Sequence, residues 1–556
     1  MEAPEPENLK TNGGTKMKNM INVKAIKTLL FCGSLLSIIS CRSDQQNNLT
    51  ESTKGINFSV NVDDFGNSNA KNQANTKTGS GDTNLISKQE FTSGPFSVTG
   101  ELSEDKNNKI TTRSFLPGAR KFRIVAYDSQ TGDYTAQDIG STSAPNQKLF
   151  ENINLVGGQK YTFITYSLNS NTDPPIAPTT NLNQAKINLT GLNGQEAGSD
   201  LLYAINENVM ISGGNTVINV TLRHQFSRIT LSVDNSNATG TPGQPSYVKG
   251  SYPLDNNSTG GFTGTIQDYF TSGNLNLKDA SITEGVNQGL AVAGITTTTK
   301  TLIINTGSED IYKSNLIIPP GAIVIGNDVN ANPVSIAING TNNGGLLPGA
   351  SYTLKLKFNS DRYVDENGIT QSKNNARYAV IRGYQWDRFN LGASASHPAQ
   401  SDPDIPSAEI HGAKYTYGAY TGQTGSYLSQ SDDQNTLQVS GWGANGNYWN
   451  TQDPCDPGYR IPTQDEYTKL LGATSNTTIG TANSYSYGRK LKSLRSEVQL
   501  VFPAAGFRST GTESGNITER GRRARYWNTS SLFDDTTAAT SPHPSIGAAI
   551  RCIRKN

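Results

Sequence analysis

Short stretches in which apolar residues alternate with polar ones recur along this chain, and they limit its fold more than any other feature. Clear examples are Phe122–Tyr127, Lys160–Tyr166, Arg228–Val233 and Tyr352–Phe358. Alternation with a period of two buries one face of a β-strand, whereas a helix would repeat every three to four residues. Gly, Asn and Pro separate the stretches, as turns require. The sequence therefore predicts a mainly β fold in which the strands pack as sandwiches.

Most of the predicted strands fall into two groups, one before and one after the turn-rich segment Asn235–Gln244. Two more, Ile56–Val62 and Phe91–Leu102, lie in the polar segment that precedes both groups. The additional strands that we expect are Ile56–Val62, Phe91–Leu102, Leu201–Ala204, Asn215–Leu222, Gly261–Ile266, Thr301–Ile304, Ser314–Ile318, Ala322–Ile325 and Val334–Ile338.

The charge balance argues against nucleic acid as a partner. The formal net charge is +1 over 556 residues, so the chain has no strong field to attract a polyanion. Charged residues make up only 17% and glycines number 55, which gives a surface that is polar without being highly charged. Extracellular β proteins often have such a composition.

The N-terminal region contains the pattern of an export signal. Met1–Lys16 is polar and unlike such a signal, so we expect Met17 to be the natural start. Three lysines then precede the apolar run Leu29–Ile39, which is too short to span a membrane comfortably. The run ends in Ile38–Cys41, which resembles a bacterial lipobox whose cysteine is acylated. We therefore predict lipid attachment at Cys41 and an outer-membrane or cell-surface location; the alternative is an ordinary signal peptide that contains a cysteine.

The four cysteines are Cys32, Cys41, Cys455 and Cys552. Signal cleavage would remove Cys32 and acylation would occupy Cys41, which leaves Cys455 and Cys552. In an oxidising compartment these two should form a disulfide that closes a loop of about a hundred residues and contributes up to about 4–5 kcal/mol. The alternative is two buried free thiols.

The middle of the chain resembles the fimbrillin family of Bacteroidetes pilus and surface proteins. The resembling residues are Phe122–Tyr127, Gly158–Tyr161, Asp200–Ala204, Leu222–Ile229 and Leu347–Tyr352. The resemblance implies two β-sandwich domains in tandem, over residues 116–240 and 241–360. A flexible tether with N-terminal strands, residues 42–115, would connect them to the signal segment, residues 1–41.

The family also implies an assembly mechanism. Its pilins are cut after a basic residue ahead of the first mature strand, and a strand of the next subunit then fills the groove. Arg113–Ser114 is a candidate for that site here, and other pilus subunits are then candidate partners. The alternative is an arginine in an ordinary loop.

The C-terminal part has a different composition and resembles another family. After a polar linker at residues 361–376, residues 377–556 hold all four tryptophans. Trp386–Gly392, Asp453–Thr463, Pro503–Arg508 and Ile550–Cys552 match the Fibrobacter succinogenes major paralogous domain. The resemblance implies an α+β fold similar to C-type lectins, with Cys455 and Cys552 bracketing much of it.

One helix of this part is marked in the sequence itself. Thr463 and Glu466 have the spacing of a capping box, and Tyr467, Leu470 and Leu471 follow on one face.

The similarity to lectins suggests two kinds of site. A calcium site would need carboxylates, but Trp527–Thr529 ends in a neutral residue and Asp534–Asp535 is the only acidic pair nearby, so we predict no metal site. Aromatic rings in Gly- and Asn-rich loops could stack on sugars without a metal. The candidates for such a glycan contact are Trp442, Tyr448, Trp449 and Trp527; the alternative is that these rings fill the core.

These features favour a display protein over an enzyme. The four histidines are scattered, no nucleophile motif is present, and we expect neither cofactor nor catalytic residue. The basic cluster Arg520–Arg525 is expected to be a solvated turn. We predict a surface lipoprotein acting in adhesion, either as a fimbrillin-like pilus component or as a stand-alone adhesin. The alternative is a non-catalytic lipoprotein that binds host or dietary glycans for nutrient capture.

Overall fold

The structure is a computed structural model, and the residues that it describes all belong to one compact unit, residues 50–556. They are 52–53, 55–66, 85–105, 119–143, 146–153, 155–212, 216–234, 251–255, 262–295, 299–305, 312–339, 346–393, 401–443, 449, 452–534, 537–540 and 543–555. Strands hold 45% of the residues and helices 6%, so the fold is mainly β, as predicted. Among the described residues, no helix combines the length and the apolar character needed to cross a membrane.

The first sandwich is formed by one seven-stranded sheet that curls so that its two halves face each other. Phe58 and Val60 from one half pack with Phe122, Ile124 and Phe163 from the other in a shared core. Strand β2 runs parallel to β12, and the other neighbours are antiparallel. The strand order is β6 (Tyr134–Ser141), β5 (Lys121–Asp128), β9 (Lys160–Ser167), β11 (Leu202–Met210), β12 (Val217–His224), β2 (Ile56–Val62) and β7 (Asn146–Leu149).

The second sandwich pairs a five-stranded sheet with a four-stranded one. Val98, Leu354 and Leu356 from the first sheet pack with Leu316 and Ile336 from the second. The first sheet has the order β18 (Lys300–Ile304), β13 (Ser227–Val233), β23 (Ser351–Asn359), β4 (Phe96–Glu104) and β3 (Leu85–Ser93). The second has the order β17 (Leu290–Ile295), β14 (Phe262–Ile266), β19 (Ser314–Ile318) and β22 (Val334–Ile338).

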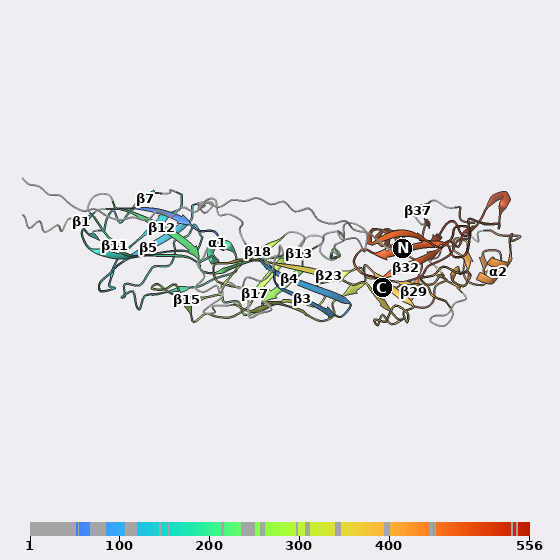
Figure 1. The fold of residues 1–556 in the computed structure, drawn as a ribbon, viewed down its shortest axis with the longest axis horizontal. Helices are drawn as coiled ribbons and strands as arrows, with labels where there is room; N and C mark the ends of the chain where they lie inside the picture. Colours follow the sequence, from blue (N-terminus) through green and yellow to red (C-terminus); the bar gives the residue numbers. More distant parts are fainter. Residues whose placement is uncertain are drawn as a thin grey trace, which may run out of the picture. The chain divides into compact units, whose positions relative to one another are not determined.

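Strands from the predicted tether, residues 42–115, are built into both sandwiches. The predicted strand Ile56–Val62 is confirmed as β2, which lies between β12 and β7. The stretch Phe91–Leu102 is not one strand but the centre of the hairpin β3–β4, which Figure 1 shows in blue beside β23. Gly94 makes the turn possible because its φ is 54°, a conformation that glycine adopts without strain.

Smaller elements flank the sandwiches. Their bounds are β1 (Ser52–Thr53) with β8 (Leu155–Val156); β10 (Lys186–Leu189), β15 (Gly273–Asn276) and β16 (Ile282–Thr283); β20 (Val324–Ile325) with β21 (Asp328–Val329); and the short helix α1 (Glu196–Ser199).

The C-terminal region, residues 362–555, has short strands, long loops and most of the helical residues. Its largest sheet has the order β24 (Arg362–Val364), β25 (Tyr378–Ile381), β26 (Tyr384–Asp387), β38 (Ile553–Arg554) and β29 (Tyr459–Arg460). The other elements are η1 (Ala408–Ile410), β27 (Lys414–Tyr415), β28 (Tyr427–Leu428), α2 (Gln430–Asn435), α3 (Gln464–Ala473), β30 (Thr474–Ile479), β31 (Gly488–Ser493), β32 (Gln499–Pro503), β33 (Phe507–Arg508), η2 (Gly511–Glu513), β34 (Ile517–Thr518), β35 (Arg525–Trp527), β36 (Leu532–Asp534) and β37 (Thr537–Thr540).

The capping box at the start of α3 is confirmed. The Thr463 hydroxyl accepts from the Glu466 amide at 3.2 Å, and the Glu466 carboxylate accepts from the Thr463 amide at 2.8 Å. Tyr467 and Leu470 are buried on the predicted face, and the Tyr467 ring stacks on Phe533 with centroids 4.3 Å apart. Local hydrogen bonds start the helix, and its apolar face attaches it to the core.

Candidate functional site

The predicted disulfide is present between Cys455 and Cys552, which are 97 residues apart in sequence. It ties the loop before β29 to the residue before β38. Asp453 holds that loop in place, because its two carboxylate oxygens accept from the amides of Cys455 (2.9 Å) and Ile461 (3.0 Å). This arrangement gives the cysteines a structural role, since the bond joins parts of the largest sheet of the C-terminal region.

Three of the predicted glycan contacts are tryptophans, and the structure buries all three rings. Trp442, Trp449 and Trp527 are 5%, 6% and 0% exposed. Their indole nitrogens donate to the carbonyls of Ser545 (2.9 Å), Ala419 (2.9 Å) and Tyr415 (2.7 Å). The alternative reading, that these rings fill the core of a loop-rich fold, is therefore the one that the structure supports, and the prediction of stacking on sugars at these three rings is wrong.

Several predicted site residues lie outside the described part of the chain. They are the lipid-attachment residue Cys41, the candidate cleavage pair Arg113 and Ser114, and the candidate glycan contact Tyr448.

Asn528 and Asp534, two of the residues considered for calcium, have structural partners, and Asp535 lies outside the described residues. Asn528 is buried, and its side-chain oxygen accepts from the amides of Ser530 and Ser531, which closes a turn. Asp534 lies 3.1 Å from the Arg525 guanidinium. Within the described ranges, no group of three or more His, Cys, Asp or Glu side chains is arranged to hold a metal ion.

A buried cluster around Asp433 was not anticipated. Its carboxylate lies 2.8 Å from Arg508, 2.7 Å from Arg520 and 3.2 Å from Lys414. Arg508 and Lys414 are fully buried. Asp433 lies in α2, Lys414 in β27 and Arg508 in β33, so the cluster connects these three elements. Arg520 also pairs with Asp433, and the expectation that it lies in a solvated turn is therefore wrong. Burial lowers the pKa of Lys414 below its ordinary value, although the negative charge of Asp433 acts in the opposite direction.

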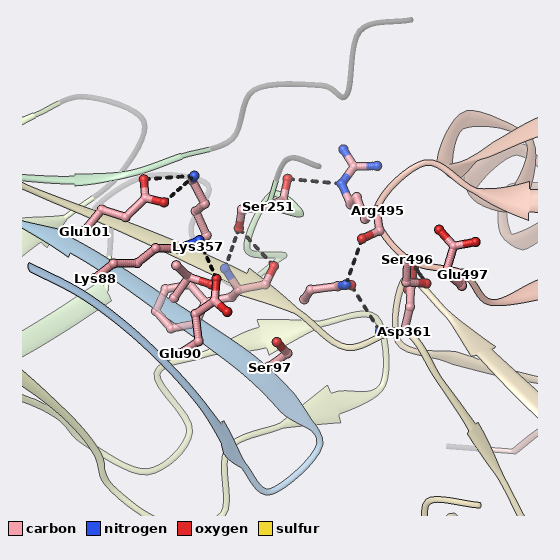
Figure 2. Close-up of a pocket in the computed structure, with 13 residues that line it drawn as sticks. Lys88, Glu90, Ser97, Glu101, Ser251, Lys357, Asp361, Arg495, Ser496 and Glu497 are labelled. Carbon is pink, nitrogen blue, oxygen red and sulfur yellow. Dashed lines mark hydrogen bonds and ion pairs between the residues drawn. The ribbon is translucent and has the colours of Figure 1, made fainter. Parts of the chain in front are cut away.

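An open polar cleft lies where the second sandwich meets the C-terminal region, and we call it the junction cleft. Its volume is about 550 Å³, within the range of small-molecule sites. Its floor is the outward face of β3, β4 and β23, and a facing wall is the turn of residues 493–497 between β31 and β32 (Figure 2). The lining residues are Lys88, Glu90, Ser97, Thr99, Glu101, Ser251, Lys357, Phe358, Asn359, Asp361, Arg495, Ser496 and Glu497.

Strand register places the floor residues in rows. Thr99 of β4 lies directly between Glu90 of β3 and Lys357 of β23, and Glu101 lies opposite Lys88. Figure 2 shows the Glu101 and Lys357 side chains joined by an ion pair, with the Lys357 nitrogen 3.0 and 3.1 Å from the two carboxylate oxygens. The alternation of strands explains this floor, because the intervening residues of β4, such as Val98, point into the core.

Asp361 forms the end of the cleft and connects its two sides. Its carboxylate accepts from the Tyr252 hydroxyl at 2.7 Å, the Arg382 amide at 2.8 Å and the Ser496 hydroxyl at 3.3 Å, and also from the Ser493 hydroxyl. Burial raises the pKa of Asp361, although the hydrogen bonds from Ser493, Tyr252 and the Arg382 amide act in the opposite direction. The predicted linker at residues 361–376 therefore begins with a partly buried, hydrogen-bonded carboxylate and with strand β24, and this part of the range is no free linker.

Arg495 completes the connection. Its Nε donates to the Ser251 carbonyl at 3.2 Å, and its guanidinium lies over the Tyr252 ring, 4.2 Å from the centroid. Only 4% of the residue is exposed. The cleft thus has a hydrogen-bonded end and an open floor of charged and hydroxyl groups, which can bind a polar ligand through hydrogen bonds. Among the described residues that line it, no nucleophile is paired with a base.

Sequence reasoning missed the junction cleft. Its floor comes from two hairpin strands and from a strand about 250 residues later, so no local motif marks it. The available signal was the polar outward face of β4, where Ser97, Thr99 and Glu101 alternate with apolar residues.

No protein-family model and no curated protein matches this sequence. Solved structures give matches at low similarity. A fimbrial assembly protein from Parabacteroides distasonis is 11% identical, with a TM-score of 0.29 over 48% of this chain and 92% of that one. A candidate cell adhesion protein from Bacteroides ovatus is 12% identical, with a TM-score of 0.31 over 58% and 95%. The fimbrial anchor protein Mfa2 from Porphyromonas gingivalis is 14% identical, with a TM-score of 0.24 over 39% and 74%. Identities this low transfer no function to this chain.

Proposed function

We propose that this protein is a lipid-anchored, non-catalytic component of the surface of a Bacteroidetes-type bacterium and that it acts in adhesion. The observation that carries the proposal is the disulfide between Cys455 and Cys552. Disulfides persist in oxidising compartments outside the cytoplasm. The same chain has an apolar run that ends in a lipobox-like sequence at Cys41, which supports export followed by lipid attachment.

Adhesion is the role that we favour for such a surface protein. The lipid would be attached near the start of the sequence, and the loop-rich, disulfide-closed C-terminal region would be the displayed part. The resemblance of residues 377–556 to a lectin-like module supports a binding role for that region. The two sandwiches would then serve as the spacer between anchor and binding region.

Assembly into a pilus is a more specific form of this proposal. Strand β2 lies between β12 and β7, and β4 lies between β23 and β3, so both fill interior positions of their sheets. Both strands precede Arg113–Ser114 in the sequence. Cleavage after Arg113 would separate them from the strands that follow, and a strand of a second subunit could then occupy the groove. Subunits of the same pilus are the partners that this form predicts.

Glycan capture for nutrition is the second candidate function. The junction cleft favours it, because the cleft is polar, open and of a size that fits a small saccharide. This function requires surface display but no pilus.

The surface location is tested by replacing Cys41 with alanine in the native host. We expect the wild-type protein to incorporate labelled fatty acid and to be digested when protease is added to intact cells. The C41A variant should lose the label and be released or retained inside. Wild-type protein that carries no label and resists protease in intact cells would contradict the proposal.

Adhesion and pilus assembly are separated by two measurements. A deletion strain should adhere less to host-cell or extracellular-matrix surfaces than the wild type. Mass spectrometry of surface material should find an N-terminus at Ser114 if subunits assemble by strand addition. If every molecule instead carries an acylated Cys41, the protein serves as an anchor subunit or stands alone. Unchanged adhesion in the deletion strain would remove the adhesion proposal.

A further inference from the structure

The acidic and basic side chains on the floor of the junction cleft pair with each other, and Glu497 of the facing turn pairs with Lys492 beside the cleft. Lys357 pairs with both oxygens of Glu101, and the Lys88 ammonium lies 2.6 Å from Glu90. At the facing turn, Glu497 lies 2.5 Å from Lys492. A charged ligand would have to displace one of these internal partners. The cleft is therefore better suited to an uncharged ligand than to an anion or a cation.

A metal ion fits the site poorly for the same reason. The carboxylate of Glu101, on the central strand of the floor, has the Lys357 ammonium group on both of its oxygens. A divalent cation would need several oxygen ligands in the place that Lys357 occupies.

An apolar ligand fits no better. Of the described residues that line the cleft, Phe358 is the single aromatic one, and it is fully buried in the core of the sandwich. Ser97, Thr99, Asn359 and Ser496 supply hydroxyl and amide groups instead. Such walls offer hydrogen bonds and little hydrophobic contact.

We infer that the junction cleft binds a neutral carbohydrate, a saccharide of one to three rings. Sugar hydroxyls both donate and accept, so they can donate to Glu90 and Glu101 and accept from Lys357 while the existing ion pairs stay in place. The volume of about 550 Å³ accommodates a ligand of that size. The rows of alternating carboxylate, hydroxyl and ammonium groups on β3, β4 and β23 provide donors and acceptors at the spacing of neighbouring strands.

The position of the cleft gives binding a further consequence. One wall comes from the second sandwich and the other from the turn of residues 493–497 in the C-terminal region (Figure 2). A saccharide that contacts both walls binds the docked arrangement and stabilises it by mass action. This inference deepens the surface function proposed above and rests on it for its biological use, but its test uses purified protein and is independent of surface display.

The first test measures binding of the purified full-length chain to an array that carries neutral, sialylated and sulfated glycans. Neutral saccharides that bind on the array are then tested free in solution by ligand-observed NMR. We expect neutral glycans to bind. Thr99→Tyr should abolish binding because the new ring fills the centre of the floor without removing a charge. Glu101→Gln should weaken binding about tenfold, the effect of losing one charge-assisted hydrogen bond.

The matched control is Thr301→Tyr. Thr301 is an exposed threonine on β18, at the opposite edge of the same sheet, so the substitution adds an equal ring away from the cleft. It should bind like the wild type. The inference is overturned if no neutral glycan binds, if acidic glycans alone bind, or if Thr99→Tyr binds as well as Thr301→Tyr. Any of these results would leave the surface location untouched, because the fatty-acid and protease measurements decide that point separately.

Discussion

At the scale of single residues, the buried carboxylate of Asp433 is the centre of a charge cluster in the C-terminal region. One negative charge faces three positive ones there, from Lys414, Arg508 and Arg520. Buried charges are tolerated only when they are paired and hydrogen-bonded, and removal of one partner leaves the others uncompensated. The cluster joins loops that have little regular structure of their own, so its loss should be felt throughout the region.

Asp433→Asn is expected to destabilise the protein by about 3–5 kcal/mol. The substitution keeps the shape of the side chain but removes the negative charge that pairs with Lys414, Arg508 and Arg520. Lys414→Met is the matched control: it removes one of the three cations and leaves Asp433 with both arginines. We expect that variant to stay within about 1 kcal/mol of the wild type. Denaturant unfolding of both variants measures the difference. Equal losses in the two variants would show that the charge imbalance is unimportant.

His411 makes stability depend on pH. Burial and the nearby Lys414 lower its pKa to about 3; Arg520 lowers it as well, while Asp433 and the Tyr485 carbonyl raise it. In the unfolded chain a histidine titrates near ~6.5. Between these two values the unfolded state binds a proton that the folded state does not, so stability decreases as the pH falls from about 6.5 toward 3. The greatest slope from this one residue is about 1.4 kcal/mol per pH unit.

The comparison of wild type with His411→Asn tests this linkage. Unfolding free energies are measured at several pH values between about 4 and 7. We expect a shallower slope in the variant, whatever its stability at neutral pH, because the asparagine does not titrate. Parallel pH profiles for the two proteins would refute the assignment.

At the scale of elements, hydrogen bonds between neighbouring residues determine where helix α3 begins. Thr463 and Glu466 satisfy two amides that would otherwise lack partners at the start of the helix. Glu466 also forms an ion pair with Arg460 of β29 at 2.5 Å. The cap therefore both starts the helix and joins it to the largest sheet of the C-terminal region.

Thr463→Ala should cost about 1 kcal/mol of stability, since the N-cap hydroxyl is lost. Thr468→Ala is the matched control, because Thr468 is exposed on the same helix and alanine is the better helix former there. We expect its effect to stay within about 0.5 kcal/mol. Thermal or denaturant unfolding compares the two, and a larger loss in the control than at the cap would contradict the role given to the capping box.

Elements of this kind were predictable because their signals are local. The strand Ile56–Val62, the capping box and the disulfide followed from alternation, from spacing and from counting cysteines. The parallel insertion of β2 beside β12 did not follow, since register between strands about 160 residues apart leaves no mark in either strand. The burial of Trp442 and Trp449 was also open, because loop sequences have no periodicity that tells an exposed ring from a packed one.

At the scale of the whole described unit, the second sandwich and the C-terminal region are joined by specific contacts in place of a free linker. Asp361 accepts hydrogen bonds from both sides. Arg362 binds both oxygens of Asp328 at 2.7 and 2.9 Å. The turns at Gly326 and Gly383 touch, with the Asn327 amide donating to the Gly383 carbonyl at 3.1 Å. Polar partners from distant strands thus fix the arrangement that forms the junction cleft.

Asp361→Ala should loosen this junction more than it unfolds either part. The Tyr252 hydroxyl and the serine hydroxyls would lose their shared acceptor, and a buried donor left unsatisfied costs about 1–3 kcal/mol. We expect faster proteolysis between residues 359 and 362 and faster amide exchange in the turn of residues 493–497. Asp365→Ala is the control: Asp365 lies four residues later, and its carboxylate accepts from Asn367, Ile369 and Gln371 within the turn between β24 and β25.

Gly383→Ala tests the same junction through the backbone. Gly383 has a φ of 75°, and a Cβ at this position would lie 1.7 Å from the Ile325 carbonyl oxygen of the second sandwich. The two turns must therefore separate, whereas the Asp361 carboxylate and the hydroxyl groups of Tyr252, Ser493 and Ser496 that donate to it are all retained. If Asp361→Ala and Gly383→Ala both accelerate proteolysis at residues 359–362 and both weaken saccharide binding in the cleft, docking and binding depend on one interface. If Gly383→Ala opens the junction but leaves binding unchanged, the floor of β3, β4 and β23 binds alone, and the facing turn contributes nothing.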